Sequence, residues 1–286
     1  MKNVLQEMIN KKQGDKKGTQ PQKSVRTAPI PKNVFRLEAA AVHNIGARSS
    51  QQDNFIFSDL SNTELVKTKG VLAVVADGMG GLRNGAEVSG IVTYMFKDIF
   101  EKQPVRFETN MELLQMLREA NEKVIAYVEQ NGGEMSGSTV VATIIKDYRL
   151  HFMSVGDSRI YLMRNGGLIQ INREHIYARD LDKSASLGEI SIDAAYSDAQ
   201  RNSLTAYVGQ EHIEAIDFNI EPITLKPGDM LLLMSDGVFG TLDEEEMIEA
   251  VNVPHLGQAA TNLENAVLSH QKHTQDNFTA TLLRIQ

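Results

Sequence analysis

The chain has 286 residues, of which 42% are hydrophobic and 6% aromatic, a composition that is typical of a folded domain and excludes wholesale disorder. It contains no cysteine, which excludes disulfides, thiolate metal ligands and cysteine nucleophiles. The net charge of −8 divides unevenly: residues 1–34 carry eight Lys/Arg against two Asp/Glu, and the rest carries 21 against 35. An acidic body argues against nucleic acid as a partner.

Residues 1–34 are polar and basic and end at a Pro-Ile-Pro step. They predict a flexible N-terminal extension, followed by one domain over 35–286. The first residues lack the apolar core of a signal peptide, and no apolar run reaches the ~18 residues of a membrane span. A cytoplasmic protein without membrane insertion is therefore expected.

The first part of the domain predicts three strands and then two helices. The segments that alternate or run apolar in the manner of strands are 35–43, 54–58 and 71–76. An amphipathic helix is expected over 84–100, where apolar residues recur at helical spacing. A second helix is expected to open at Thr109, with Glu112 completing a capping box.

The second part is richer in strands. Apolar patterns predict strands at 138–147, 149–157, 159–171, 215–224, 230–234 and 278–285. The Asn165-Gly166-Gly167 step predicts a hairpin turn, because these residues tolerate positive φ. Residues 172–205 predict an insert with short helices. A short helix is expected from Thr241, capped together with Glu244, and another near 257–270.

Hairpin-linked strands with helices in pairs indicate antiparallel sheets in an α+β fold rather than a doubly wound one. The stretch VLAVVADGMGGLRNG (71–85) therefore does not fit a dinucleotide loop, and Arg83 occupies the slot of the third glycine. No GK[ST] follows, so a P-loop is also excluded.

Aspartates recur where strands begin or end, each beside glycine or asparagine; they are Asp53, Asp77, Asp157, Asp236 and Asp276. Any one of them alone is explained by a turn. Together, carboxylates gathered at one sheet edge would repel unless a cation neutralised them. Oxygen ligands without cysteine favour Mg²⁺ or Mn²⁺, and the histidines lack zinc-site spacing.

These motifs resemble, in order and spacing, the metal-dependent type 2C (PPM) protein phosphatases, and the bacterial branch most closely. The matching segments are Arg48 with Asp53, Asp77-Gly78-Met79-Gly80-Gly81, Ser136-Gly137-Ser138-Thr139, Gly156-Asp157-Ser158-Arg159, Ser235-Asp236-Gly237 and Asp276-Asn277. The resemblance covers about residues 36–286. It implies a four-layer α-β-β-α sandwich, in which two antiparallel sheets are flanked by helix pairs and the metals lie in a cleft at one edge.

The resemblance also implies roles for the metal-binding residues. Asp77 would bridge two core Mn²⁺ or Mg²⁺ ions, and the carbonyl of Gly78 would bind one of them. Asp236 and Asp276 would complete that site, and Asp157 with Asp236 would hold a weaker third ion. Water activated in this dinuclear centre would hydrolyse phosphoserine or phosphothreonine.

Two further residues are assigned to the reaction by the resemblance. Arg48 would grip the substrate phosphate, as suits a guanidinium, and Asp53 would orient water or metal ligands. The chain departs from the family where Gln52 replaces a carboxylate and Leu82 replaces a histidine, which leaves the general acid open.

The insert 172–205 corresponds to the family's flap, which shapes substrate choice. Here the family's D-H-S is Glu174-His175-Ile176, and a structural role is favoured for His175 over a catalytic one. Asn202 lies where some relatives bring a polar ligand to the third metal. His175 and Asn202 are therefore secondary candidates.

The leading hypothesis is an Mg²⁺/Mn²⁺-dependent protein serine/threonine phosphatase acting on phosphorylated proteins, with a Ser/Thr kinase and its substrates as partners. We expect a monomer. Two alternatives stay open: a pseudophosphatase that only binds or regulates, and a phosphatase for small molecules. Under the leading hypothesis, the basic segment 1–34 would recruit the phosphorylated partner.

Overall fold

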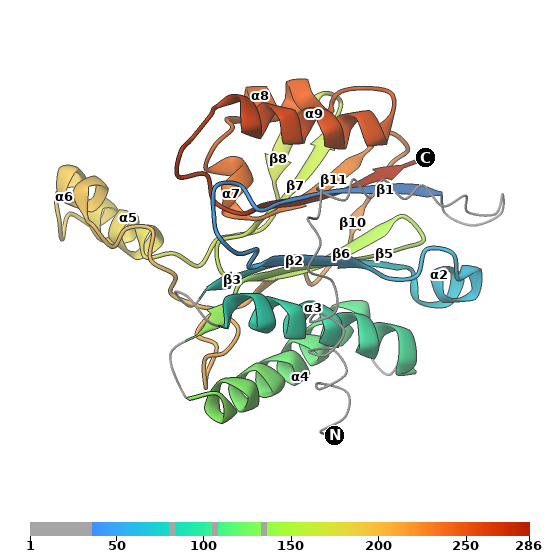
Figure 1. Ribbon diagram of the computed structural model, residues 1–286, viewed down its shortest axis with the longest axis horizontal. Coiled ribbons are helices and arrows are strands. Elements are labelled where there is room, and N and C mark those ends of the chain that lie inside the picture. The colour runs from blue at the N-terminus through green and yellow to red at the C-terminus, as the bar shows by residue number, and fades with distance from the viewer. Residues whose placement is uncertain (1–35, 80–83, 105–107, 133–135) are drawn as a thin grey trace.

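The structure is a computed structural model that describes residues 36–79, 84–104, 108–132 and 136–286. Two antiparallel sheets lie face to face, with α8 and α9 covering one and α3 and α4 covering the other (Figure 1). The predicted α+β sandwich of four layers is confirmed. The predicted extension 1–34 lies outside the described residues.

Among the described residues, the first sheet has five strands in the order β1-β12-β11-β7-β8. Their bounds are Leu37–Asn44, Phe278–Ile285, Met230–Met234, Arg159–Arg164 and Gly167–Gln170. The predicted hairpin between β7 and β8 forms with positive φ at Asn165 (53°) and Gly166 (79°), as a type I′ turn requires.

The second sheet follows the order β10-β6-β5-β3-β2, with β4 on β3 and β9 on β6. The bounds are β2 Asp53–Phe57, β3 Val71–Met79, β4 Gly137–Ser138, β5 Val140–Lys146, β6 Arg149–Val155, β9 Asp217–Phe218 and β10 Ile223–Thr224. The expectation of one strand over 215–224 is wrong. The side chain of Asn219, not the backbone, bonds Phe152 N at 2.7 Å and Leu150 O at 3.0 Å, which divides the strand into two short pieces.

The helices pack through apolar faces onto the outer sides of the sheets. Their bounds are α2 Thr63–Lys69, α3 Gly85–Lys102, α4 Thr109–Gln130, α5 Ala178–Ser186, α6 Ile192–Ser197, α7 Asp236–Phe239, α8 Glu244–Val251 and α9 Leu256–Ser269. A third apolar cluster, built around Val71, Val141 and Leu231, fills the space between the sheets. No helix in the described ranges is both long and apolar enough to cross a membrane.

Both predicted capping boxes are wrong. Thr109 is the first residue of α4 and makes no capping bond. The box that forms belongs to Asp243 and Glu246, which exchange two 2.9 Å bonds at the start of α8. Thr241 donates instead to Gly237 O at the end of α7, so its hydroxyl is already engaged before α8 begins.

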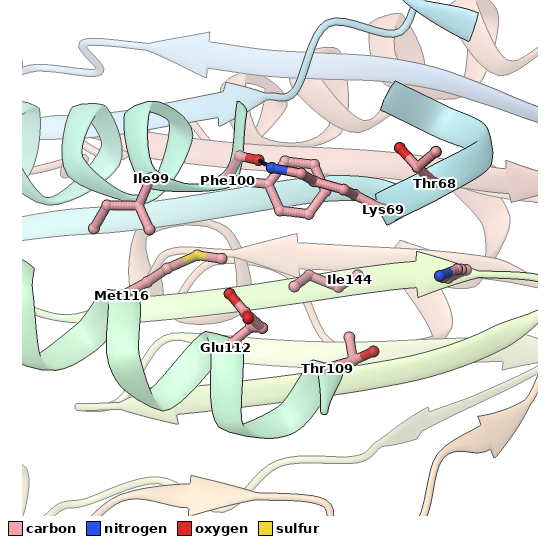
Figure 2. Close-up of a pocket in the computed structure, with 9 residues that line it drawn as sticks. Thr68, Lys69, Ile99, Phe100, Thr109, Glu112, Met116 and Ile144 are labelled. Atoms are coloured by element: carbon pink, nitrogen blue, oxygen red, sulfur yellow. Dashed lines mark hydrogen bonds between the residues drawn. The ribbon is translucent and has the colours of Figure 1, made fainter. Parts of the chain in front are cut away.

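A small cavity of about 30 Å³ lies between α2, α3, α4 and β5 (Figure 2). The Lys69 ammonium donates to the carbonyls of Phe100 and Gln103 at the end of α3. It therefore satisfies carbonyls that the helix leaves without partners and places positive charge at the negative end of the helix dipole. The cavity has room for roughly two waters and contains none of the predicted site residues.

Candidate active site

A polar cavity of about 220 Å³ opens at the edge where the two sheets meet. The end of β3 and the start of α7 lie at this end of the sandwich (Figure 1). The cavity is lined by Arg48, Gln52, Asp77, Gly78, Met79, Thr139, Asp157, Leu204, Asp236, Asp276 and Asn277. Four of the five predicted aspartates thus face one space.

Each of these four aspartates is half-buried and held by a different element. Asp77 lies on β3, Asp157 in the turn between β6 and β7, Asp236 at the start of α7 and Asp276 just before β12. Thr139 fixes the backbone of Asp77 on both sides, because its N–H donates to Asp77 O at 2.8 Å and its hydroxyl accepts from Asp77 N at 3.1 Å. The carboxylates are therefore presented from both sheets on short, well-anchored segments.

The carboxyl groups raise one another's pKa. Burial, followed by the charges of Asp53 and Asp236, raises the pKa of Asp77 well above its usual range. Burial and the neighbouring Asp236 raise the pKa of Asp157 to about 7. Burial and then Asp276 raise the pKa of Asp236. Negative charge in this cavity is costly, which is the condition that a bound cation relieves.

Gly78 is confined by neighbouring backbone. A Cβ atom at this position would lie 2.1 Å from Gly85 O and 2.7 Å from Gln52 O. Its N–H donates to Gln52 O at 3.1 Å. The glycine lets the chain after Asp77 pass close to the start of α3 while lining the cavity. Gly80 and Gly81, and the departure at Leu82, lie outside the described residues.

Asp53 lies behind the cavity rather than in it. Its Cα is directly opposite Asp77 in the β2–β3 pairing, and the residue is 3% exposed. The Ser235 hydroxyl donates to its Oδ2 at 2.7 Å, whereas Oδ1 is buried with no hydrogen-bond partner. Burial raises the pKa of Asp53 to about 6, although the Ser235 bond acts in the opposite direction.

Arg48 lies at the mouth of the cavity, where its Nη2 donates to Asp276 Oδ2 at 2.6 Å. Asn277 anchors the segment 45–52 that carries Arg48. The sequence predicts no site role for Asn277. The amide of Asn277 donates to Ile45 O at 2.8 Å and Ser50 O at 3.0 Å, and its Oδ1 accepts from Gln52 N at 2.8 Å.

The two secondary candidates occupy different places. His175 is buried behind the turn that carries Asp157 and does not line the cavity. Asn202 is exposed and is not among the lining residues; Leu204 reaches the cavity instead. The structure therefore does not bring Asn202 to the site.

The donors of this cavity are carboxylates, amides and backbone oxygens, which suit a hard cation such as Mg²⁺ or Mn²⁺. Among the described residues, no three histidine, aspartate or glutamate side chains converge closely enough to enclose an ion by themselves. An ion here needs further oxygens from the backbone and from water, as Mg²⁺ sites usually do. The unpartnered Asp53 Oδ1 and the raised pKa values fit such a group.

Comparisons with known proteins identify the family of the chain. The family model for protein phosphatase 2C matches residues 42–273. The serine/threonine phosphatase stp of Listeria innocua is 31% identical over 190 residues, which span 64% of this chain and 72% of that protein. These relatives define the class: bacterial serine/threonine phosphatases, which are hydrolases.

The chain belongs to the protein phosphatase 2C family, as the resemblance predicted. Its fold is similar to that of the Mycobacterium tuberculosis serine/threonine phosphatase PstP/Ppp, with a TM-score of 0.70 and 26% identity over 87% of this chain and 99% of that one. It is also similar to a PstP catalytic domain in complex with two manganese ions, with a TM-score of 0.67 and 25% identity over 87% and 98% of the two chains.

Proposed function

We propose that the chain is a Mn²⁺- or Mg²⁺-dependent protein phosphatase that hydrolyses phosphoserine and phosphothreonine in proteins. The observation that carries the proposal is the cavity in which Asp77, Asp157, Asp236 and Asp276 face one another with Arg48 at the mouth. Four carboxylates in one cavity, of which Asp77, Asp157 and Asp236 have raised pKa values, need positive charge, and the arginine at the mouth suits a phosphate.

Residues for two core ions are available. Asp77 is central to the group, since, in addition to burial, the charges of the other four aspartates all raise its pKa. We assign Asp77, the Gly78 carbonyl, Asp236 and Asp276 to the core ions, and Asp157 with Asp236 to a weaker third. The relative that contains two manganese ions supports the binding of two core ions. When bound, the ions supply Lewis acidity toward the phosphate ester and water.

Arg48 and Asp53 have roles other than metal binding: Arg48 binds the phosphate and Asp53 orients a ligand. The Arg48 side chain is 56% exposed and offers a planar fork to two oxygens of a phosphate that enters the cavity. Asp53 accepts a hydrogen bond from Ser235, the residue before Asp236, and thereby orients the Asp236 carboxylate from behind the cavity. Among the described residues that line the cavity there is no histidine, and we assign the proton for the leaving serine or threonine oxygen to water.

The proposal extends to partners. We propose that phosphorylated proteins are the substrates, that a Ser/Thr kinase opposes the enzyme, and that the protein acts as a monomer in the cytoplasm. The domain 35–286 would be catalytic, and the basic segment 1–34 would recruit acidic partners.

A metal-dependent assay tests the proposal. Purified protein should release phosphate from p-nitrophenyl phosphate and from a phosphothreonine peptide with Mn²⁺, and EDTA should stop it. Asp77→Asn and Asp236→Asn should lose activity while remaining folded by circular dichroism. Asp98→Asn, on the outer surface of α3, is the matched control and should keep wild-type rates. Wild-type rates in both cavity variants would refute the mechanism, and hydrolysis of small esters without the peptide would favour a small-molecule substrate.

A further inference from the structure

We propose that His175 is a positioning residue: it fixes the turn that carries Asp157 and joins this turn to the base of the insert 172–205. This base, here called the neck, consists of residues 175–176 paired with residues 204–205. The inference rests on the proposed function, in which Asp157 is a metal ligand. It assigns a specific task to a histidine that the reaction itself does not use.

His175 and Gly156 are joined by two reciprocal hydrogen bonds. The His175 N–H donates to Gly156 O at 2.8 Å. The Gly156 N–H donates to His175 Nδ1 at 3.1 Å. Because Nδ1 accepts, the imidazole is neutral with its proton on Nε2. The side chain thus satisfies the buried N–H that immediately precedes Asp157, which no backbone ladder reaches.

Two further contacts restrict the turn 156–158. Gly156 has φ of +100°, and a Cβ atom there would lie 2.7 Å from the Cβ of Thr139. On the far side, the Thr139 and Ser158 hydroxyls are 2.7 Å apart and share a hydrogen bond. Asp157 is therefore held between Thr139, which lies between β4 and β5, and His175, on the insert.

The same histidine belongs to the neck of the insert. Its carbonyl accepts from Thr205 N at 2.9 Å, and Ile176 and Leu204 form an antiparallel bridge. Beyond this neck, α5 and α6 project away from the sandwich (Figure 1). Leu204 lines the cavity. His175 ties this neck to the residue before Asp157, while Asn172 and Glu174 bond the two residues after it.

The contacts of His175 separate positioning from direct participation. The residue is 9% exposed, it does not line the cavity, and its Nδ1 is already engaged by Gly156. Its effect on the reaction passes through the Asp157 carboxylate.

Two substitutions of His175 make a matched pair. In His175→Asn, the Oδ1 acceptor lies close to where Nδ1 was, so the Gly156 bond is retained. In His175→Gln, the acceptor moves to the position of Nε2, and the Gly156 N–H loses its partner. Calorimetric titration of the full chain with Mn²⁺ and amide exchange at Gly156 by NMR give two readouts that do not depend on turnover.

We expect His175→Gln to weaken the weakest Mn²⁺ binding event by about 10-fold, the scale of losses when a ligand's supporting partner is removed. Exchange at Gly156 should become about 10-fold faster. His175→Asn should stay close to wild type in both. In an Asp157→Asn background, His175→Gln should have no further effect on Mn²⁺ binding.

The outcomes separate the two proposals. If the wild type binds Mn²⁺ and His175→Gln binds it equally well, the positioning role is wrong. Equal loss in the Asn and Gln variants would also overturn it, because it would point to packing rather than to the Nδ1 bond. If the wild type binds no Mn²⁺, the proposed function fails instead, while the Gly156 exchange rates still report whether His175 holds the turn.

Discussion

Ser235 and Asp53 are joined by a 2.7 Å hydrogen bond that crosses from one sheet to the other. Ser235 follows β11 in the first sheet, and Asp53 begins β2 in the second. The same hydroxyl accepts from Thr279 N at 3.0 Å. One buried serine, the residue directly before Asp236, therefore links the Asp53 carboxylate to strand β12.

Ser235→Ala is expected to destabilise the protein by roughly 1–3 kcal/mol, the cost of leaving buried hydrogen-bonding groups without partners. The free energy of unfolding, from urea denaturation in EDTA at pH 8, checks this. Ser61→Ala is the control, because Ser61 makes the same kind of bond to Asp59 at the exposed surface; it should cause little change. Equal losses in the two variants would contradict the cross-sheet role.

Asp157→Asn is expected to stabilise the metal-free protein at high pH. The folded pKa of Asp157 is raised to about 7 by burial and then by Asp236, whereas an unfolded aspartate titrates near 3.9. The folded state therefore binds the proton more tightly, and stability falls as the pH rises from about 4 to about 7. Asparagine carries no charge and escapes this loss.

In EDTA, the gain for Asp157→Asn should be roughly 1–3 kcal/mol at pH 8 and should shrink steadily toward pH 5. Urea denaturation across this range measures it. Saturating Mn²⁺ should reduce the gain at pH 8, because asparagine is the poorer ligand. A gain that is constant between pH 5 and pH 8 would show that charge is not its cause.

Arg48→Ala is expected to lower kcat/KM for a phosphothreonine peptide by about 10–100-fold, the scale of a lost charged hydrogen bond. Arg48→Lys should recover only part, because an ammonium lacks the planar fork. Steady-state kinetics with Mn²⁺ checks both. Arg118→Ala, on the exposed face of α4, is the matched control; an Arg48→Ala enzyme as active as this control would remove Arg48 from phosphate binding.

Gly78→Ala and Gly90→Ala should shift stability in opposite directions. At Gly78 a methyl group would lie 2.1 Å from Gly85 O, so we expect a loss of about 2 kcal/mol or more. At Gly90, inside α3, the nearest atom is Asn54 Nδ2 at 3.5 Å. Alanine there should add about 0.5–1 kcal/mol, since it favours the helix. Urea denaturation of both variants is the measurement, and a tolerated Gly78→Ala would contradict the close approach to α3.

Strands with unbroken apolar patterns were predictable from sequence. The expected strands 230–234 and 278–285 coincide with β11 and β12. All five residues of β11 are buried and apolar, and polar residues mark where both strands begin and end. The helix caps were not predictable, since Thr241 with Glu244 and Asp243 with Glu246 both have capping-box spacing. Only the position of α7 decides between them. The seven-residue helix α2 is too short for periodicity to reveal it.

The aspartates of the cavity were found because each follows or precedes a strand and stands beside a turn residue. Their supporting residues carry no such local signal. Asn277 bonds to Ser50 and Gln52 from 227 and 225 residues away. Thr139 reaches the backbone of Asp77 across a pair of strands. Partners of this kind are set by the register of the sheets, which a single sequence does not reveal.

The place of β12 has a consequence for synthesis. This strand lies between β1 and β11, so the first sheet stays split until residues 278–285 have been made, after the residues of every other strand described here. Asp276, just before it, reaches the cavity only then. A chain still emerging from the ribosome can form the second sheet with Asp77 in place, but it lacks the opposite half. The cavity is therefore complete only once the two ends of the domain have met.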